Sequence, residues 1–148
     1  MTEHNEILTP DKSELGKKTH YDTQYNPEKL FPMSRKAKRD EIGIGTELPF
    51  YGIDIWNHYE VSWLDQKGKP IVAIAEIIYD CASPNIIESK SMKLYFNSFN
   101  NTKCKSADNA RAMMERDLSA RVGVPVTVNI KLLSEIKKEK FAVRLKRF

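Results

Sequence analysis

Cysteine and histidine are scarce in this chain, which has two cysteines and three histidines in 148 residues. There is no Cys-x-x-Cys pair, and His4, His20 and His58 are scattered along the sequence. This pattern excludes a disulfide framework and a zinc site of the usual ligand spacing. We therefore expect Cys81 and Cys104 to be reduced thiols, and we predict no bound metal.

Long apolar runs are also absent. The longest, Ile71 to Tyr79, is interrupted by Glu76 and is too short to span a bilayer. The first six residues carry acidic side chains where a signal peptide would be basic. The length suits one domain, and 41% hydrophobic with 30% charged residues is typical of a soluble globular protein. The sequence predicts a cytoplasmic protein with no membrane partner.

The net charge of +4 permits weak attraction to phosphate-bearing ligands but indicates nothing specific about nucleic acid. We interpret the cluster of Arg35, Lys36, Lys38 and Arg39 as a solvated basic loop. In the tail, from Lys140 to Phe148, basic and apolar residues alternate as in an edge strand. The alternative, a nucleic-acid-binding arm, would predict affinity that falls steeply with salt. No direct nucleic-acid partner is expected.

Two strands are predicted in the middle of the chain. In the run from Trp56 to Leu64, Tyr59, Val61 and Trp63 alternate with polar residues, as a strand with one buried face requires. Residues 66–70 then read as a hairpin turn containing a glycine. The run from Ile71 to Tyr79 is rich in β-branched residues and predicts the returning strand.

Two helices and a further strand follow the hairpin. The first helix, from about residue 89, should bury Met92, Tyr95, Phe96 and Phe99. Ser106 is the expected N-cap of a second helix reaching about residue 121, whose predicted buried residues are Ala110, Met113, Met114 and Leu118. A strand over residues 124–130 completes an α+β fold, an antiparallel sheet with two helices packed on one face. We expect residues 1–14 to be a flexible tail and residues 15–148 to form a single module. Within this module, residues 15–32 should form an arm that wraps around the domain and is pinned by the apolar side chains of Tyr21, Tyr25, Leu30 and Phe31.

The stretch from Glu88 to Tyr95 is the candidate site, because it joins a strand to a helix start. Ser89 or Ser91 can cap that helix, while spare backbone N–H groups and Lys90 face an anion. The Glu88 carboxylate could accept two parallel N–H bonds from a guanine-type base. The alternative is an ordinary helix cap with Glu88 and Lys90 solvated beside it.

The same residues carry a resemblance to a known family. The chain from about residue 15 to 135 resembles the N-terminal half of two-module QueF, the NADPH-dependent 7-cyano-7-deazaguanine reductases of queuosine biosynthesis, a tRNA modification. The segments that carry the resemblance are Leu15-Gly16-Lys17-Lys18-Thr19, Arg39-Asp40, Leu48-Pro49-Phe50-Tyr51-Gly52, Tyr59-Glu60-Val61-Ser62-Trp63-Leu64 and above all Glu88-Ser89-Lys90-Ser91-Met92-Lys93-Leu94-Tyr95.

The resemblance implies a tunnelling fold (T-fold) module, of the kind that pairs its sheet with others into a barrel and binds purine-like rings where modules meet. It assigns Ile87, Glu88 and Ser89 to the substrate, 7-cyano-7-deazaguanine, and Ser89 and Lys90 to the cofactor, NADPH. A lone module leaves sheet edges unpaired, so we expect an oligomer.

This sequence shows no counterpart of the catalytic residues that the family needs. In the family, a cysteine thiolate adds to the nitrile before hydride transfer and an aspartate supplies protons, and both lie in the second module. Neither Cys81 nor Cys104 has matching neighbours. The resemblance therefore implies a reductase module that is inactive alone, completed by a second T-fold module or by self-association. The alternative is a non-catalytic deazaguanine-binding or assembly module.

Overall fold

The computed structural model describes residue 13, residues 16–18 and residues 21–136. Its elements, in chain order, are η2 (Pro27–Lys29), β1 (Pro32–Ser34), α1 (Arg35–Glu41), β2 (Ile53–Leu64), β3 (Pro70–Asp80), β4 (Asn85–Ile87), α2 (Ser89–Asn97), α3 (Ala107–Val122), β5 (Thr127–Leu132) and η3 (Leu133–Glu135). The strand expected in the tail lies outside the described residues. Among the described helices, none has the length and apolar character needed to span a membrane.

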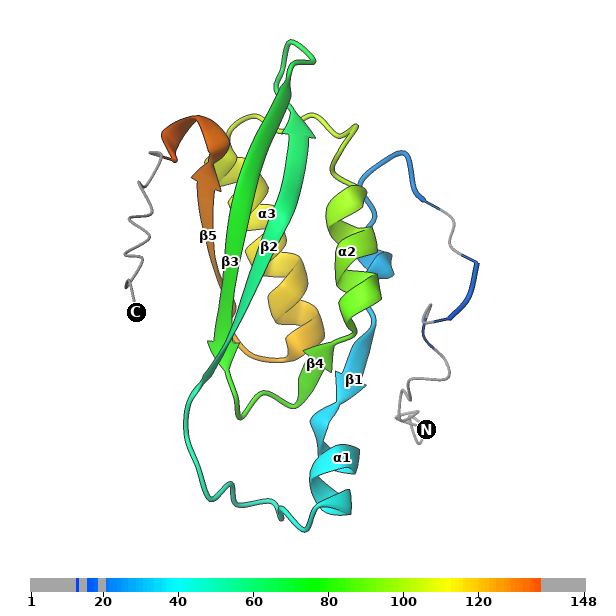
Figure 1. Ribbon diagram of the computed structural model, residues 1–148, viewed down its shortest axis with the longest axis vertical. Helices are drawn as coiled ribbons and strands as arrows, with labels where there is room; N and C mark the ends of the chain where they lie inside the picture. Colours follow the sequence, from blue (N-terminus) through cyan, green and yellow to red (C-terminus); the bar gives the residue numbers. More distant parts are fainter. Residues whose placement is uncertain (1–12, 14–15, 19–20, 137–148) are drawn as a thin grey trace, which may run out of the picture.

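The main sheet has three antiparallel strands in the order β2-β3-β5, and β1 pairs with β4 in a small second sheet (Figure 1). The predicted hairpin is confirmed. Its turn is closed by the Asp65 carboxylate, which accepts N–H groups of Lys67 and Lys69, and by Gly68 at φ +86°. The last strand begins at Thr127, three residues later than predicted.

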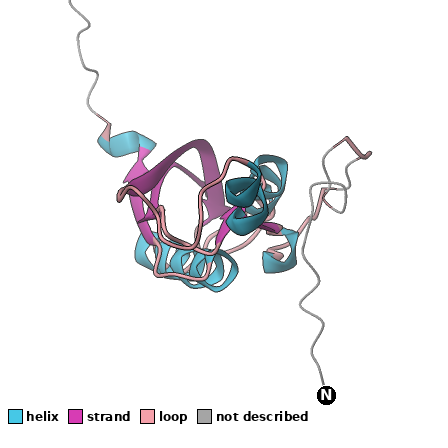
Figure 2. Ribbon diagram, turned by 90° about the horizontal axis from the view of Figure 1, so that it is seen from below, coloured by secondary structure: helices cyan, strands magenta, loops and turns pink. Residues whose placement is uncertain are grey.

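Helices α2 and α3 pack on the same face of the main sheet, which confirms the predicted α+β fold. Their buried side chains share one core with the inward residues of β2 and β3, and Figure 2 shows the helices gathered on one side of the curved sheet. The core includes Trp63, Ala75, Ile77, Tyr95, Phe96, Phe99, Met114 and Leu118. The other face of the sheet exposes Ile53 and Ile55, at 59% and 53%. Hydrophobic burial thus fixes how α2 lies on the sheet.

The prediction that Tyr59 is buried was wrong. The pairing of β2 with β3 shifts register between His58 and Val61, as at a β-bulge. Because a bulge changes which side chains point inward, His58 lies on the inner face before it and Val61 after it. Tyr59 is 68% exposed.

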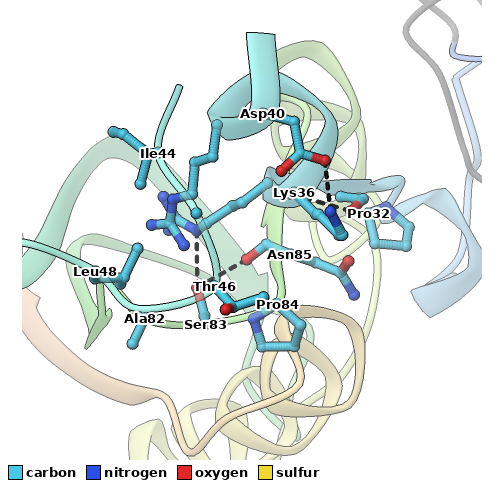
Figure 3. Close-up of a pocket in the computed structure, with 14 residues that line it drawn as sticks. Pro32, Lys36, Asp40, Ile44, Thr46, Leu48, Ala82, Ser83, Pro84 and Asn85 are labelled. Atoms are coloured by element: carbon cyan, nitrogen blue, oxygen red, sulfur yellow. Dashed lines mark hydrogen bonds and ion pairs between the residues drawn. The ribbon is translucent and has the colours of Figure 1, made fainter. Parts of the chain in front are cut away.

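The predicted basic loop at Arg35 to Arg39 was also wrong, because these residues form helix α1. The Ser34 hydroxyl accepts the Lys36 N–H, and Lys36 pairs with Asp40 at 2.5 Å, one turn along the helix (Figure 3). Arg35 forms an ion pair with Asp54 at the start of β2. The segment lacks an apolar period, so its helix is specified by capping and charge pairs that a hydrophobic pattern does not reveal.

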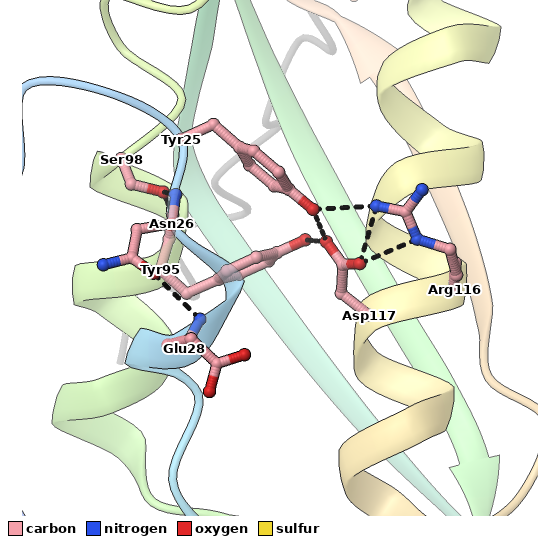
Figure 4. A network of polar contacts seen from close by, with 7 residues as sticks. All are labelled: Tyr25, Asn26, Glu28, Tyr95, Ser98, Arg116 and Asp117. Atoms are coloured by element: carbon pink, nitrogen blue, oxygen red, sulfur yellow. Dashed lines mark hydrogen bonds and ion pairs between the residues drawn. The ribbon is translucent and has the colours of Figure 1, made fainter.

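The arm packs against both long helices through Tyr25. Its hydroxyl donates to the Asp117 carboxylate at 2.5 Å, and the Tyr95 hydroxyl donates to the same oxygen at 2.8 Å (Figure 4). Arg116 completes the cluster by donating to both Asp117 and the Tyr25 hydroxyl. Farther along, the Asn26 N–H donates to the Ser98 hydroxyl. The arm is thus held largely by polar contacts; of the apolar side chains predicted to pin it, Leu30 is buried, whereas Tyr21 is 62% exposed.

The cluster predicts that the folded chain loses stability between pH about 10 and about 12. Burial, with the hydrogen bond and charge of Asp117, raises the pKa of Tyr25 from 10.0 to about 12. In that window the folded state holds a proton that the unfolded state releases, so the free energy of unfolding falls as pH rises. Urea midpoints on either side of pH about 10 measure this, and Tyr25→Phe should flatten the dependence. Equal slopes for both proteins would contradict the prediction.

Candidate ligand-binding corner

The residues predicted to bind ligands, Ile87 to Lys90, meet where β4 ends and α2 begins; we call them the Ser89 corner. The N-cap of α2 is Glu88, so the prediction that Ser89 or Ser91 caps the helix was wrong. The Glu88 carboxylate accepts the backbone N–H groups of Lys90 at 2.7 Å and of Ser91 at 2.8 Å, one on each oxygen. Its side chain thus folds back over the first turn, where the helix dipole favours a negative charge.

The cap leaves fewer hydrogen-bonding groups for a ligand than the sequence suggested. The N–H groups of Lys90 and Ser91 are taken, so they are not the spare donors that we expected for an anion. A carboxylate has about four acceptor positions. Three are used here, because the Ser89 hydroxyl also donates to Oε1 at 3.3 Å. If that long bond breaks, each oxygen can accept one N–H of a ring edge.

The four residues of the Ser89 corner differ in their exposure to solvent. Glu88 is 4% exposed and Ile87 is 1% exposed, so the Ile87 side chain belongs to the core. Ser89 is exposed and Lys90 is half-buried, with its ammonium donating to the Lys17 carbonyl at 2.9 Å. Two further bonds fix the corner to the arm, since the Glu88 N–H donates to the Phe31 carbonyl and the Ser91 hydroxyl accepts the Phe31 N–H.

Beside the corner, α2 and the bulged part of β2 enclose a hollow of about 430 Å³. Lys90, Lys93 and His58 are among the residues that line it. The His58 ring stacks on Phe96 with centroids 4.3 Å apart, and burial lowers the pKa of His58, which keeps the ring neutral at pH 7. The two ammonium groups and the exposed Ser89 hydroxyl suit phosphate oxygens in charge and chemistry, and so fit a dinucleotide cofactor.

The described residues hold no positioned nucleophile and no group of three side chains that could bind a metal ion. Cys104 is 1% exposed, and burial raises the pKa of its thiol. Cys81 lies in the turn after β3, where its carbonyl accepts from Arg39 at 2.6 Å. Thiolate chemistry needs a stabilised anion within reach of substrate, and the buried Cys104 lacks that setting.

Fold and corner together define an α+β module in which a buried carboxylate caps the start of α2. The family model described as "Nitrile reductase, 7-cyano-7-deazaguanine-reductase N-term" matches residues 21–130. The chain therefore belongs to this nitrile reductase family and matches its N-terminal domain, which confirms the resemblance found in the sequence.

Several curated relatives share about half of their aligned residues with this chain. They include three proteins named NADPH-dependent 7-cyano-7-deazaguanine reductase. The one from Ralstonia nicotianae is 53% identical over 133 residues, which cover 88% of this chain and 48% of the relative. The one from Legionella pneumophila is 54% identical, covering 85% and 45%. The one from Burkholderia mallei is 50% identical, covering 88% and 48%. This chain thus spans about half the length of the curated relatives it matches.

Sequence reasoning missed two carboxylates that organise the fold, Glu88 at the corner and Asp117 beneath the arm. Nothing in the sequence indicated that Glu88 would cap α2, because glutamate is not among the preferred N-cap residues. Asp117 was not singled out either, although an acidic residue one position before the predicted buried Leu118 was the available signal.

Proposed function

We propose that this chain is the N-terminal module of a reductase that converts 7-cyano-7-deazaguanine to 7-aminomethyl-7-deazaguanine with NADPH, in the biosynthesis of queuosine. The observation that carries the proposal is the family match over residues 21–130 together with coverage of only about half of each relative. We expect the protein to act in the cytoplasm.

In this proposal the Ser89 corner supplies half of a site. Glu88 accepts the two N–H groups of the deazaguanine ring edge, beside the backbone of Ile87 and the hydroxyl of Ser89. Ser89 and Lys90 hold NADPH, which supplies hydride when bound. The cap supports this role for Glu88, because two backbone N–H groups hold its carboxylate at one place. The thiol and the proton-donating aspartate must come from a second T-fold module.

We further propose that the module assembles, either with a separate chain that carries the cysteine or with itself. Among the strands that the structure describes, β2 and β5 are the edges of the main sheet, and Ile53 and Ile55 are exposed on its outer face. Unpaired edges and apolar faces favour association. Sedimentation of the purified chain should show an oligomer at micromolar concentration, and a strictly monomeric species would count against this part of the proposal.

Calorimetric titration of the chain with 7-cyano-7-deazaguanine tests the site. We expect saturable binding that guanine competes for, and no oxidation of NADPH by this chain alone. The absence of binding, with and without NADPH, would contradict a ring site on these residues. A role in assembly alone, the second candidate function, would then be the interpretation that the exposed sheet face still supports.

A further inference from the structure

A second hollow, of about 620 Å³, lies between α1, the loop after it and the turn between β3 and β4. In Figure 3 its walls carry Lys36 and Asp40 from α1, Thr46 and Leu48 from the loop, and Ser83 from the turn. None of the residues of the Ser89 corner lines it. Its size is within the range of small-molecule sites in proteins.

The charges of this hollow leave one cation without a carboxylate partner. Arg35 pairs with Asp54, and Lys36 pairs with Asp40. Arg39, the third cation in the lining, makes no ion pair with any described residue. Its guanidinium donates to the Cys81 carbonyl at 2.6 Å and lies 5.9 Å from the centroid of the Phe50 ring. A guanidinium carries five N–H donors, so most of its donors remain for an acceptor in the hollow.

The loop wall adds further donors. Gly45 and Thr46 line the hollow, and within the described part of the chain their backbone N–H groups donate to no protein acceptor. The Thr46 hydroxyl likewise makes no hydrogen bond there. Neighbouring backbone N–H groups beside a guanidinium are the donors that phosphate oxygens accept from. Ile44, Leu48 and Ala82, which also line the hollow, offer apolar surface for a ring.

We propose that this hollow binds a phosphate-bearing ligand of mononucleotide size, with the phosphate on Arg39, Gly45 and Thr46 and the base against Ile44 and Leu48. The site stands on its own geometry and does not depend on the function proposed for the Ser89 corner. It would give the module a second ligand, bound between α1 with its following loop and the turn that joins β3 to β4.

The test is a titration of the isotope-labelled chain with AMP, followed by amide chemical shifts. We expect saturable shifts at Gly45 and Thr46, with adenosine binding at least about tenfold more weakly because it lacks the phosphate. Inorganic phosphate as a third ligand separates a nucleotide site from a simple anion site. No saturable shift at the loop by about 10 mM AMP would overturn the proposal, as would equal binding of phosphate and AMP.

Two variants test whether Arg39 and Thr46 hold the phosphate. Arg39→Gln should weaken AMP binding at least about tenfold, and Thr46→Val should weaken it severalfold. The valine variant covers the case in which losing the contact between Arg39 and Cys81 disturbs the fold. Lys38→Gln is the matched control, because Lys38 is on the same helix, is 73% exposed and pairs with Glu41. Equal losses for Arg39→Gln and Lys38→Gln would mean general charge attraction and would overturn the site.

Discussion

Replacing Glu88 with alanine is expected to lower the free energy of unfolding by about 1–3 kcal/mol and to abolish binding of 7-cyano-7-deazaguanine. The stability loss has a direct cause. Alanine leaves the N–H groups of Lys90 and Ser91 without the acceptors that now lie 2.7 and 2.8 Å away. Urea denaturation measures the first effect and calorimetric titration the second.

Glu88→Gln separates the two roles of this carboxylate. An amide keeps one carbonyl oxygen, so it can still cap one N–H, and the stability loss should be about half that of Glu88→Ala. It cannot offer two acceptors to a ring edge, so binding should still fall by about tenfold or more. Glu41→Ala is the control, since within residues 21–136 the Glu41 side chain pairs with Lys38 alone, on the exposed surface of α1. A glutamine variant that binds as tightly as the original chain would contradict the ring-anchoring role.

The parts of the fold that the sequence predicted well are those with local signals. The β2–β3 hairpin followed from β-branched runs on either side of a glycine turn, and the Ser106 cap of α3 was confirmed by its bond to the Asn109 N–H at 3.0 Å. Burial of Tyr95, Phe96 and Phe99 followed from their spacing. In each case the residues that specify the structure lie within a few positions of one another.

The features that were missed depend on distant partners. The bulge before Val61 is a property of the pairing between β2 and β3. The alternation of apolar and polar residues along β2 alone does not reveal it. The cluster around Asp117 joins residues 92 positions apart, and nothing near Tyr25 in the sequence indicates its partner. At the Ser89 corner, the family motif indicated the place. The structure adds that the Glu88 carboxylate already caps its own helix.

The second large effect is expected at Asp117, which is 7% exposed. Asp117→Ala should lower the free energy of unfolding by about 2–4 kcal/mol, because it leaves the hydroxyls of Tyr95 and Tyr25 without their acceptor. The Tyr95 hydroxyl, in a side chain that is 0% exposed, would lose its partner, and Tyr25 would lose the bond that pins the arm. Asp108→Ala is the control, on the same helix with the carboxylate side chain 88% exposed. Losses of equal size would contradict the prediction.

A double-mutant cycle tests whether the cost comes from the stranded hydroxyl. Tyr95→Phe alone should destabilise the chain, because it removes one hydrogen bond to Asp117. In the Asp117→Ala background the same change should be neutral or stabilising, since it removes a buried donor with no acceptor.

The arm also holds the Ser89 corner, because the Phe31 carbonyl accepts the Glu88 N–H and the Phe31 N–H donates to the Ser91 hydroxyl. Asp117→Ala should therefore weaken ligand binding at Glu88 as well, although Asp117 is 29 positions away in the sequence.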